Sequence, residues 1–231
     1  MKLNLSKALF VVPLLVASSS VQAATMTATY VGTVDQQTTD LTGVAATFAP
    51  PLTKFDSSLG LLIQVDVTYQ GTGTTSITAK NTSASAGTFH NTTNVVYTLG
   101  SGDTGVDGLL GSLTFTGTSD SGVNNLASGA SGTFGPYTYD VSQSATFTSA
   151  GDLARFIGSG PLTFLVTTAT SASNSNTGGN INLNQDTQAG GVVTVTYTYQ
   201  TAAVPEPSSA LMLGLAGGLV GLGARLRKRR A

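Results

Sequence analysis

The stretch Val193-Thr194-Val195-Thr196-Tyr197-Thr198-Tyr199-Gln200 alternates apolar and polar residues without a break. Successive side chains of a β-strand point to opposite faces of a sheet, so valine and tyrosine line one face of this segment and threonine lines the other. An apolar face opposite a polar face predicts a half-buried strand of an antiparallel sheet. This segment therefore favours an all-β fold.

The same alternation recurs upstream, first in Met26–Val34 and again in Leu61–Gln70. Shorter alternating runs lie at Val95–Leu99, Leu109–Phe115, Val141–Phe147 and Leu162–Val166. Glycine-rich stretches, which are typical of turns, lie at Gly71–Gly73, Gly100–Gly102, Gly129–Gly135, Gly158–Gly160 and Gly178–Asn180. Only Ser149–Ile157 has the pattern of a short helix. We therefore predict an antiparallel β-sandwich, jelly-roll-like, of about eight to ten strands. A solenoid is the alternative fold, but no fixed repeat period supports it.

The region between residues 24 and 203, which we expect to form one extracytoplasmic domain, is acidic. Its basic residues are Lys54, Lys80 and Arg155, whereas it holds ten aspartates and no glutamate, which gives a net charge of −7. Such a surface repels phosphate groups, so nucleic-acid binding is disfavoured. The chain contains no cysteine, which excludes disulfides and thiol chemistry.

Residues 1–23, MKLNLSKALFVVPLLVASSSVQA, have the layout of a secretory signal peptide. Lys2 and Lys7 give it a charged beginning, an apolar run follows, and Val21-Gln22-Ala23 fits the small-x-small pattern of a cleavage site. We expect signal peptidase to cut between Ala23 and Ala24. An uncleaved membrane helix is the alternative, and the shortness of the apolar run argues against it.

Residues 204–231 combine three features. Val204-Pro205-Glu206-Pro207 is extended and rigid, because each proline fixes φ and disfavours helix at the residue before it. Ala210–Ala224 is an uncharged run with five glycines, short for a transmembrane helix, which needs about 20 apolar residues. A basic cluster follows, made of Arg225, Arg227, Lys228, Arg229 and Arg230. By the positive-inside rule this cluster stays cytoplasmic, so the sequence predicts a marginal transmembrane helix with residues 24–203 outside the cytoplasm.

The Val-Pro-Glu-Pro motif, the short apolar run and the terminal basic cluster, in this order, resemble the PEP-CTERM sorting signal of Gram-negative bacteria. The resemblance implies that an exosortase, a membrane protease or transpeptidase, recognises the tail and removes or exchanges it. It also implies a transient stay in the inner membrane, followed by a place at the cell surface or outside the cell. A plain C-terminal membrane anchor is the alternative.

Two further stretches resemble motifs of the choice-of-anchor E domains, which occur on exported bacterial proteins. The first is Lys54–Gly60, which runs into the expected strand at Leu61, and the second is Phe156–Gly160, which runs into the expected strand at Leu162. The resemblance implies a surface-displayed β domain and brings no catalytic residues with it.

Residues suited to catalysis are few. His90 is the only histidine, which excludes a multi-histidine metal site, and no Gly-x-Ser-x-Gly elbow accompanies it. A carboxylate pair for glycoside hydrolysis would have to consist of two aspartates, and no pattern selects such a pair. We therefore predict a non-catalytic protein without a cofactor.

Two binding sites follow from single loops. Asp103 and Asp107 in Gly102–Gly108 could hold calcium through their carboxylate oxygens, although the spacing differs from that of an EF-hand. Tyr137 and Tyr139 could stack on sugar rings if they lie on a loop; the alternative is that they are core or strand-face residues. The leading hypothesis is an exported surface or matrix protein, sorted by an exosortase and associated with exopolysaccharide in a biofilm. The alternative is a glycan-binding or weakly glycan-active β-sandwich module.

Overall fold

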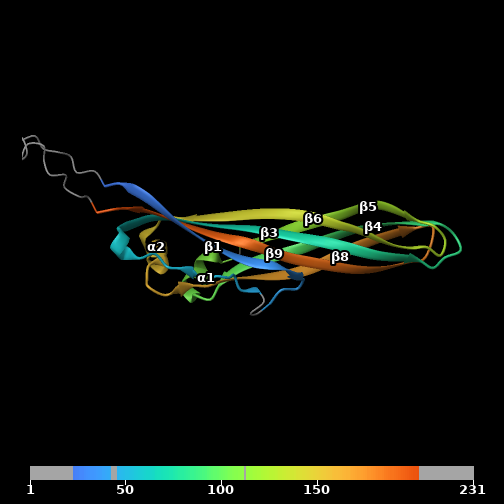
Figure 1. Ribbon diagram of the computed structural model, residues 1–231, viewed down its shortest axis with the longest axis horizontal. Coiled ribbons are helices and arrows are strands. Elements are labelled where there is room, and N and C mark those ends of the chain that lie inside the picture. Colours follow the sequence, from blue (N-terminus) through green and yellow to red (C-terminus); the bar gives the residue numbers. More distant parts are fainter. Residues whose placement is uncertain (1–22, 43–45, 112, 203–231) are drawn as a thin grey trace, which may run out of the picture. The chain divides into compact units, whose positions relative to one another are not determined.

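The computed structural model describes residues 23–42, 46–111 and 113–202 (Figure 1). The chain divides into two units, and Thr25–Thr201 forms one of them. The other unit, Met1–Ala24 with Ala202–Ala231, lies almost entirely outside the described residues. The expected signal peptide up to residue 22 and the expected C-terminal helix therefore fall outside them. Within the part that is described, no helix is long and apolar enough to span a membrane.

Long strands dominate the unit Thr25–Thr201. In chain order the elements are β1 (Thr25–Thr38), β2 (Leu52–Thr53), the 3₁₀ helix η2 (Ser57–Leu59), β3 (Leu61–Asn81), β4 (Gly87–Ser101), α1 (Thr104–Leu110), β5 (Leu113–Leu126), β6 (Ser131–Phe147), α2 (Ala150–Phe156), β7 (Pro161–Leu162), β8 (Phe164–Thr177) and β9 (Ile181–Gln200). The clearest alternating segment of the sequence, Val193–Gln200, forms the second half of β9.

Two antiparallel sheets form the sandwich. One has the strand order β1-β9-β3-β6 and the other has the order β5-β4-β8, with β2 and β7 as a separate short pair. Strands that follow one another along the chain cross repeatedly between the two sheets, as they do in Greek-key and jelly-roll sandwiches. The predicted antiparallel β-sandwich is confirmed.

The strands are longer than the alternation predicted. The expected turn Gly71–Gly73 lies inside β3, and Gly135 lies inside β6. Leu109, expected in a strand, belongs to α1. The short helix predicted at Ser149–Ile157 is confirmed as α2, and the Ser149 hydroxyl accepts a hydrogen bond from the Asp152 N–H at 3.3 Å.

Glycines inside these strands make room for tyrosine rings on the inward face. A Cβ atom at Gly73 would lie 2.1 Å from the hydroxyl of Tyr139, and one at Gly117 would lie 2.3 Å from the Tyr139 ring. A Cβ atom at Gly191 would lie 2.5 Å from the Tyr69 hydroxyl. Gly73, which suggested a turn, is therefore a packing position, which explains why β3 continues through it.

Buried side chains form two apolar clusters. The large cluster joins both sheets through residues such as Tyr69, Tyr97, Phe164 and Tyr197. Both short helices dock on it through Val106, Leu110, Leu153 and Phe156. The small cluster consists of Ile77, Ala79, Phe89, Leu126 and Ile181. The opposite face of the first sheet is polar: Thr29 of β1 lies beside Thr196 of β9, with 3.2 Å between their hydroxyl oxygens.

Candidate functional site

The fold brings together two segments that are far apart in the sequence, Lys54–Gly60 and Phe156–Gly160. Phe55 and Ile157 form a parallel bridge. The Phe55 N–H donates to the Phe156 carbonyl at 2.8 Å, and the Gly158 N–H donates to the Phe55 carbonyl at 3.0 Å. The two segments that carry the choice-of-anchor E resemblance therefore lie side by side.

Two buried phenylalanines hold this junction in place. Phe55 and Phe156 are 2% and 0% exposed. The Phe55 ring centroid lies 5.2 Å from that of Tyr199 and 5.7 Å from that of Tyr197, both on β9. Phe156 packs on Phe147 of β6 with 5.3 Å between the ring centroids. Each segment is thus fixed to the first sheet by an aromatic side chain, and the neighbouring polar residues are left at the surface.

Glycines shape the ends of both segments. Gly60 has φ 145° and Gly158 has φ 153°. Residues other than glycine rarely adopt backbone angles in this positive-φ region. At Gly60 a Cβ atom would lie 2.1 Å from the Gln200 carbonyl oxygen, so no side chain fits there. The path of each segment at this junction therefore depends on its glycine.

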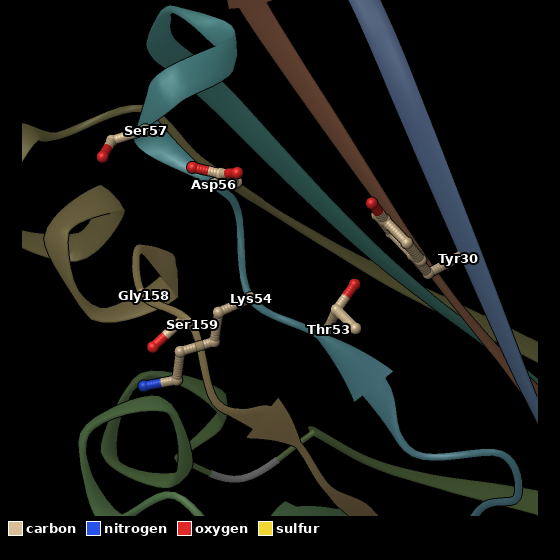
Figure 2. A pocket seen from close by; sticks show the side chains of 7 residues that line it. All are labelled: Tyr30, Thr53, Lys54, Asp56, Ser57, Gly158 and Ser159. Carbon is tan, nitrogen blue, oxygen red and sulfur yellow. The ribbon is translucent and has the colours of Figure 1, made fainter.

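A pocket of about 460 Å³ opens at the junction. Its lining residues come from β1, from β2, η2 and the connection between them, and from the connection between α2 and β7; they are Tyr30, Thr53, Lys54, Asp56, Ser57, Gly158 and Ser159. Figure 2 shows Tyr30 and Thr53 on one side of the segment that carries Lys54 and Asp56, with Gly158 and Ser159 on the other. We call this the junction pocket.

The charged groups of the junction pocket are partly paired. Lys54 Nζ lies 2.5 Å from Oδ2 of Asp103, at the beginning of α1. Asp56 Oδ1 accepts a hydrogen bond from the Ser58 N–H at 2.8 Å. This backbone hydrogen bond, with help from the Ser58 side chain, holds the pKa of the Asp56 carboxyl below its usual value. Asp56 therefore presents a full negative charge at neutral pH.

The hydroxyl groups of the pocket are unpaired. Within the described residues, the side-chain hydroxyls of Tyr30, Thr53, Ser57 and Ser159 make no hydrogen bond to protein. The Tyr30 ring is nevertheless fixed, because it packs edge-on against Tyr197 with 5.8 Å between the centroids. The pocket therefore offers hydrogen-bonding groups to a ligand, next to one positioned aromatic ring.

The two aspartates considered for calcium are used by the protein itself. Asp103 begins α1: its Oδ1 accepts from the Gly105 N–H at 2.9 Å and the Val106 N–H at 3.2 Å. Asp107 lies inside α1, and its Oδ1 accepts from the Ser101 N–H at 2.8 Å. In the described part of the chain, no group of three or more acidic or histidine side chains is placed to hold a metal ion.

The two tyrosines considered for glycan stacking are not on a loop. Both belong to β6. Tyr139 is 7% exposed, and its hydroxyl lies 3.0 Å from that of Tyr97 inside the sandwich. Tyr137 is half-buried and packs against the small apolar cluster. The strand continues through Gly135 and Pro136, so the loop position considered for these tyrosines is wrong, and the Tyr139 ring is buried.

His90 lies on β4, away from the junction pocket. Its Nε2 is 2.6 Å from Oδ1 of Asp120 on β5, and both side chains are exposed. The Gly122 N–H also donates to Asp120 Oδ1, at 2.7 Å. These two contacts, the backbone one first, hold the pKa of the Asp120 carboxyl below its usual value. The pair is a surface contact between neighbouring strands.

The sequence predicted only part of the junction pocket. The resemblance singled out Lys54–Gly60 and Phe156–Gly160, but no pattern placed them together or added Tyr30. The processing residues Val204–Pro207 and the basic cluster lie outside the described residues, as does the expected signal peptide except for Ala23.

The comparison with protein families gives one match. The model of the PEP-CTERM protein-sorting motif matches residues 203–230. That motif implies an exported protein of Gram-negative type, sorted to the surface by an exosortase. A search of curated proteins finds no match. The resemblance to choice-of-anchor E domains stays a prediction.

Solved structures add little. The chain is similar to a protein of the extra small virus of the prawn Macrobrachium rosenbergii at 8% identity and a TM-score of 0.18, over 84% of this chain and 94% of that chain. It is similar to a mud crab tombus-like virus protein at 10% identity and a TM-score of 0.21, over 90% of this chain and 96% of that chain. Scores this low carry no argument about either fold or function.

Proposed function

We propose that this chain is a non-catalytic exported protein that acts at the cell surface or in the extracellular polysaccharide matrix after exosortase processing. The observation that carries the proposal is the PEP-CTERM motif at residues 203–230, directly after the last strand of the sandwich. Signal peptidase removes residues 1–23, and the C-terminal apolar run then holds the protein in the inner membrane until the exosortase acts.

The charge distribution supports this order of events. Residues 24–203 carry ten aspartates and three basic residues, so this part of the chain is not attracted to an anionic lipid surface. Its location depends on the tail, and on whatever replaces the tail after processing. Association with exopolysaccharide in a biofilm is part of the proposal, because a polymer rich in hydroxyl groups suits an acidic surface rich in threonine and serine.

Mass spectrometry of the mature protein tests the proposal. In a host with an active exosortase, we expect a chain that begins at Ala24 and lacks the intact segment from Ser208 to Ala231. In the same host without the exosortase, we expect the tail to remain, and Glu206→Ala should have the same effect. An intact tail in the competent host would overturn the proposal.

A glycan-binding module is the second candidate. The observation in its favour is the junction pocket, where four hydroxyls have no partner among the described residues. A screen against the host's own polysaccharide separates the two candidates: saturable binding favours the glycan-binding module, and a flat screen favours a purely structural role.

A further inference from the structure

The junction pocket carries groups that the protein itself does not use. The four hydroxyls of Tyr30, Thr53, Ser57 and Ser159 can each donate one hydrogen bond and accept others. Asp56 is an acceptor with about four lone-pair sites, of which the Ser58 backbone uses one at 2.8 Å. The pocket therefore offers both donors and acceptors, which matches a ligand whose own groups are mostly hydroxyls.

Charge excludes the simplest other ligands. Lys54 is paired with Asp103 at 2.5 Å, and Asp56 adds a second carboxylate nearby, so the three side chains together are negative and disfavour phosphate or sulfate. Calcium takes six to eight oxygen ligands, typically about two or more of them carboxylates. Among the described residues, Asp56 is the one carboxylate that lines the pocket. A neutral ligand fits this balance best.

The size and shape of the junction pocket also favour a neutral ligand. A volume of about 460 Å³ lies within the usual range for small-molecule pockets. Gly158 leaves the wall open beside Lys54, since a Cβ atom there would come within 3.3 Å of the Lys54 Cδ. The Tyr30 ring, held by Tyr197, supplies one apolar surface of fixed orientation.

We propose that the junction pocket binds one neutral sugar residue of a polysaccharide. Asp56 accepts hydrogen bonds from sugar hydroxyls, while the hydroxyls of Ser57 and Ser159 donate to and accept from the same ring. Tyr30 contributes its hydroxyl and the edge of its ring. This inference rests on the proposed function, because it makes the junction pocket the contact between the exported domain and the polysaccharide matrix.

The test measures sugar binding to the full chain in detergent by saturation-transfer NMR and titration calorimetry. The probes are glucose, galactose, mannose, N-acetylglucosamine and an acid hydrolysate of the host's polysaccharide. We expect saturable binding of at least one neutral sugar. Asp56→Asn keeps a side chain that can begin η2 but removes the charge, and should weaken binding about tenfold or more. Tyr30→Phe keeps the packing on Tyr197 and should weaken binding about three- to tenfold.

Thr196→Ala is the matched control, because it removes a hydroxyl from the opposite face of the same sheet and should leave binding unchanged. The proposal is overturned if no probe binds, or if Asp56→Asn and Tyr30→Phe bind as tightly as the unchanged chain. Binding of inorganic phosphate or calcium alone would also overturn it. Mass spectrometry distinguishes the two proposals. A correctly processed protein that binds no sugar would overturn only sugar binding at the junction pocket. An unprocessed protein that binds sugar would overturn only exosortase processing.

Discussion

The interior of the sandwich has two regions that are held together by different physical means. The large apolar cluster buries aromatic and aliphatic side chains from both sheets and both helices. Between it and the small cluster lies a polar layer, which consists of Thr75, Asn91, Thr93, Ser119, Gln185 and Thr187. Along β4, for example, the inward residues pass from Phe89 in the small cluster through Asn91 and Thr93 to Val95 in the large one.

The polar layer is a continuous hydrogen-bond network. The Asn91 amide donates to Gln185 Oε1 at 3.0 Å, and the Thr93 hydroxyl donates to the same oxygen at 3.1 Å. Gln185 in turn donates to the Thr187 hydroxyl at 2.8 Å. Among fully buried side-chain atoms of the described residues, only Thr170 Oγ1 lacks a partner. The layer therefore avoids the cost of unpaired polar groups.

The large cluster and the polar layer contribute differently to the fold. Burial of apolar area is non-directional, so the large cluster disfavours a slip of one residue, which would turn its side chains outward, but discriminates less against a slip of two residues. Hydrogen bonds are directional, and a slip of two residues in β3, β4 or β9 would break several bonds of the polar layer at once. We infer that the large cluster supplies most of the stability and that the polar layer fixes strand register.

The largest loss of stability should come from a substitution that creates a cavity in the large cluster. Phe164 is 0% exposed and belongs to the large cluster, and Phe164→Ala should lower the free energy of unfolding by about 3–5 kcal/mol. The matched change is Phe89→Ala in the small cluster, where the partly buried Phe134, Tyr137 and Leu183 can move into the space. We expect a smaller loss there. Urea denaturation of both variants measures the difference, and an equal loss would contradict the proposed division.

A smaller effect should come from breaking one link of the polar layer. The Ser119 hydroxyl donates to Thr75 Oγ1 at 2.9 Å. Thr75→Val keeps the shape but leaves this buried donor unpaired, which should cost about 1–3 kcal/mol. Adding Ser119→Ala removes the unpaired donor, so the double variant should lose less stability than the two single losses together. A double-mutant cycle by urea denaturation makes the measurement, and strictly additive losses would show that the two hydroxyls act independently.

The same two regions show how far the sequence could predict the fold. The alternation at Val193–Gln200 and Leu61–Gln70 predicted strands correctly, because their inward residues are apolar. The prediction ended at Gly71 because the next inward residues, Gly71, Gly73 and Thr75, look like a turn and not like a core. Glycine there accommodates a tyrosine ring from elsewhere in the chain, and Thr75 pairs with another strand. Such long-range contacts leave no local pattern.

The sorting motif and the junction pocket also differ in how far the sequence could predict them. The sorting motif at Val204–Pro207 was predicted from the sequence, since all of its features are contiguous, and the family match at residues 203–230 confirms the motif. The junction pocket could not be predicted as a whole, because a bridge between Phe55 and Ile157 assembles it and β1 supplies Tyr30. The helix α1 was missed because glycines, which favour turns, lie within it at Gly105 and Gly108 and beside it at Gly102 and Gly111. Its beginning depends on the single side chain of Asp103.

The smallest effect should come from Asp103, whose carboxylate caps the beginning of α1 and pairs with Lys54. Asp103→Ala removes the cap of α1 and should cost about 0.5–2 kcal/mol, whereas Asp103→Asn keeps a capping side chain and should cost less. The hydrogen bond from Lys54, followed by that from the Val106 N–H, holds the pKa of Asp103 below its usual 3.8. A lowered folded-state pKa means that this stabilisation is present above pH 3.8 and is lost as the pH falls through the lower folded value. Urea denaturation at several acidic pH values should show a larger loss of stability in the unchanged chain than in Asp103→Asn, where Asp56 and Asp120, whose pKa values are also lowered, still respond to pH. Parallel curves for the two proteins would mean that the charge of Asp103 contributes nothing to stability.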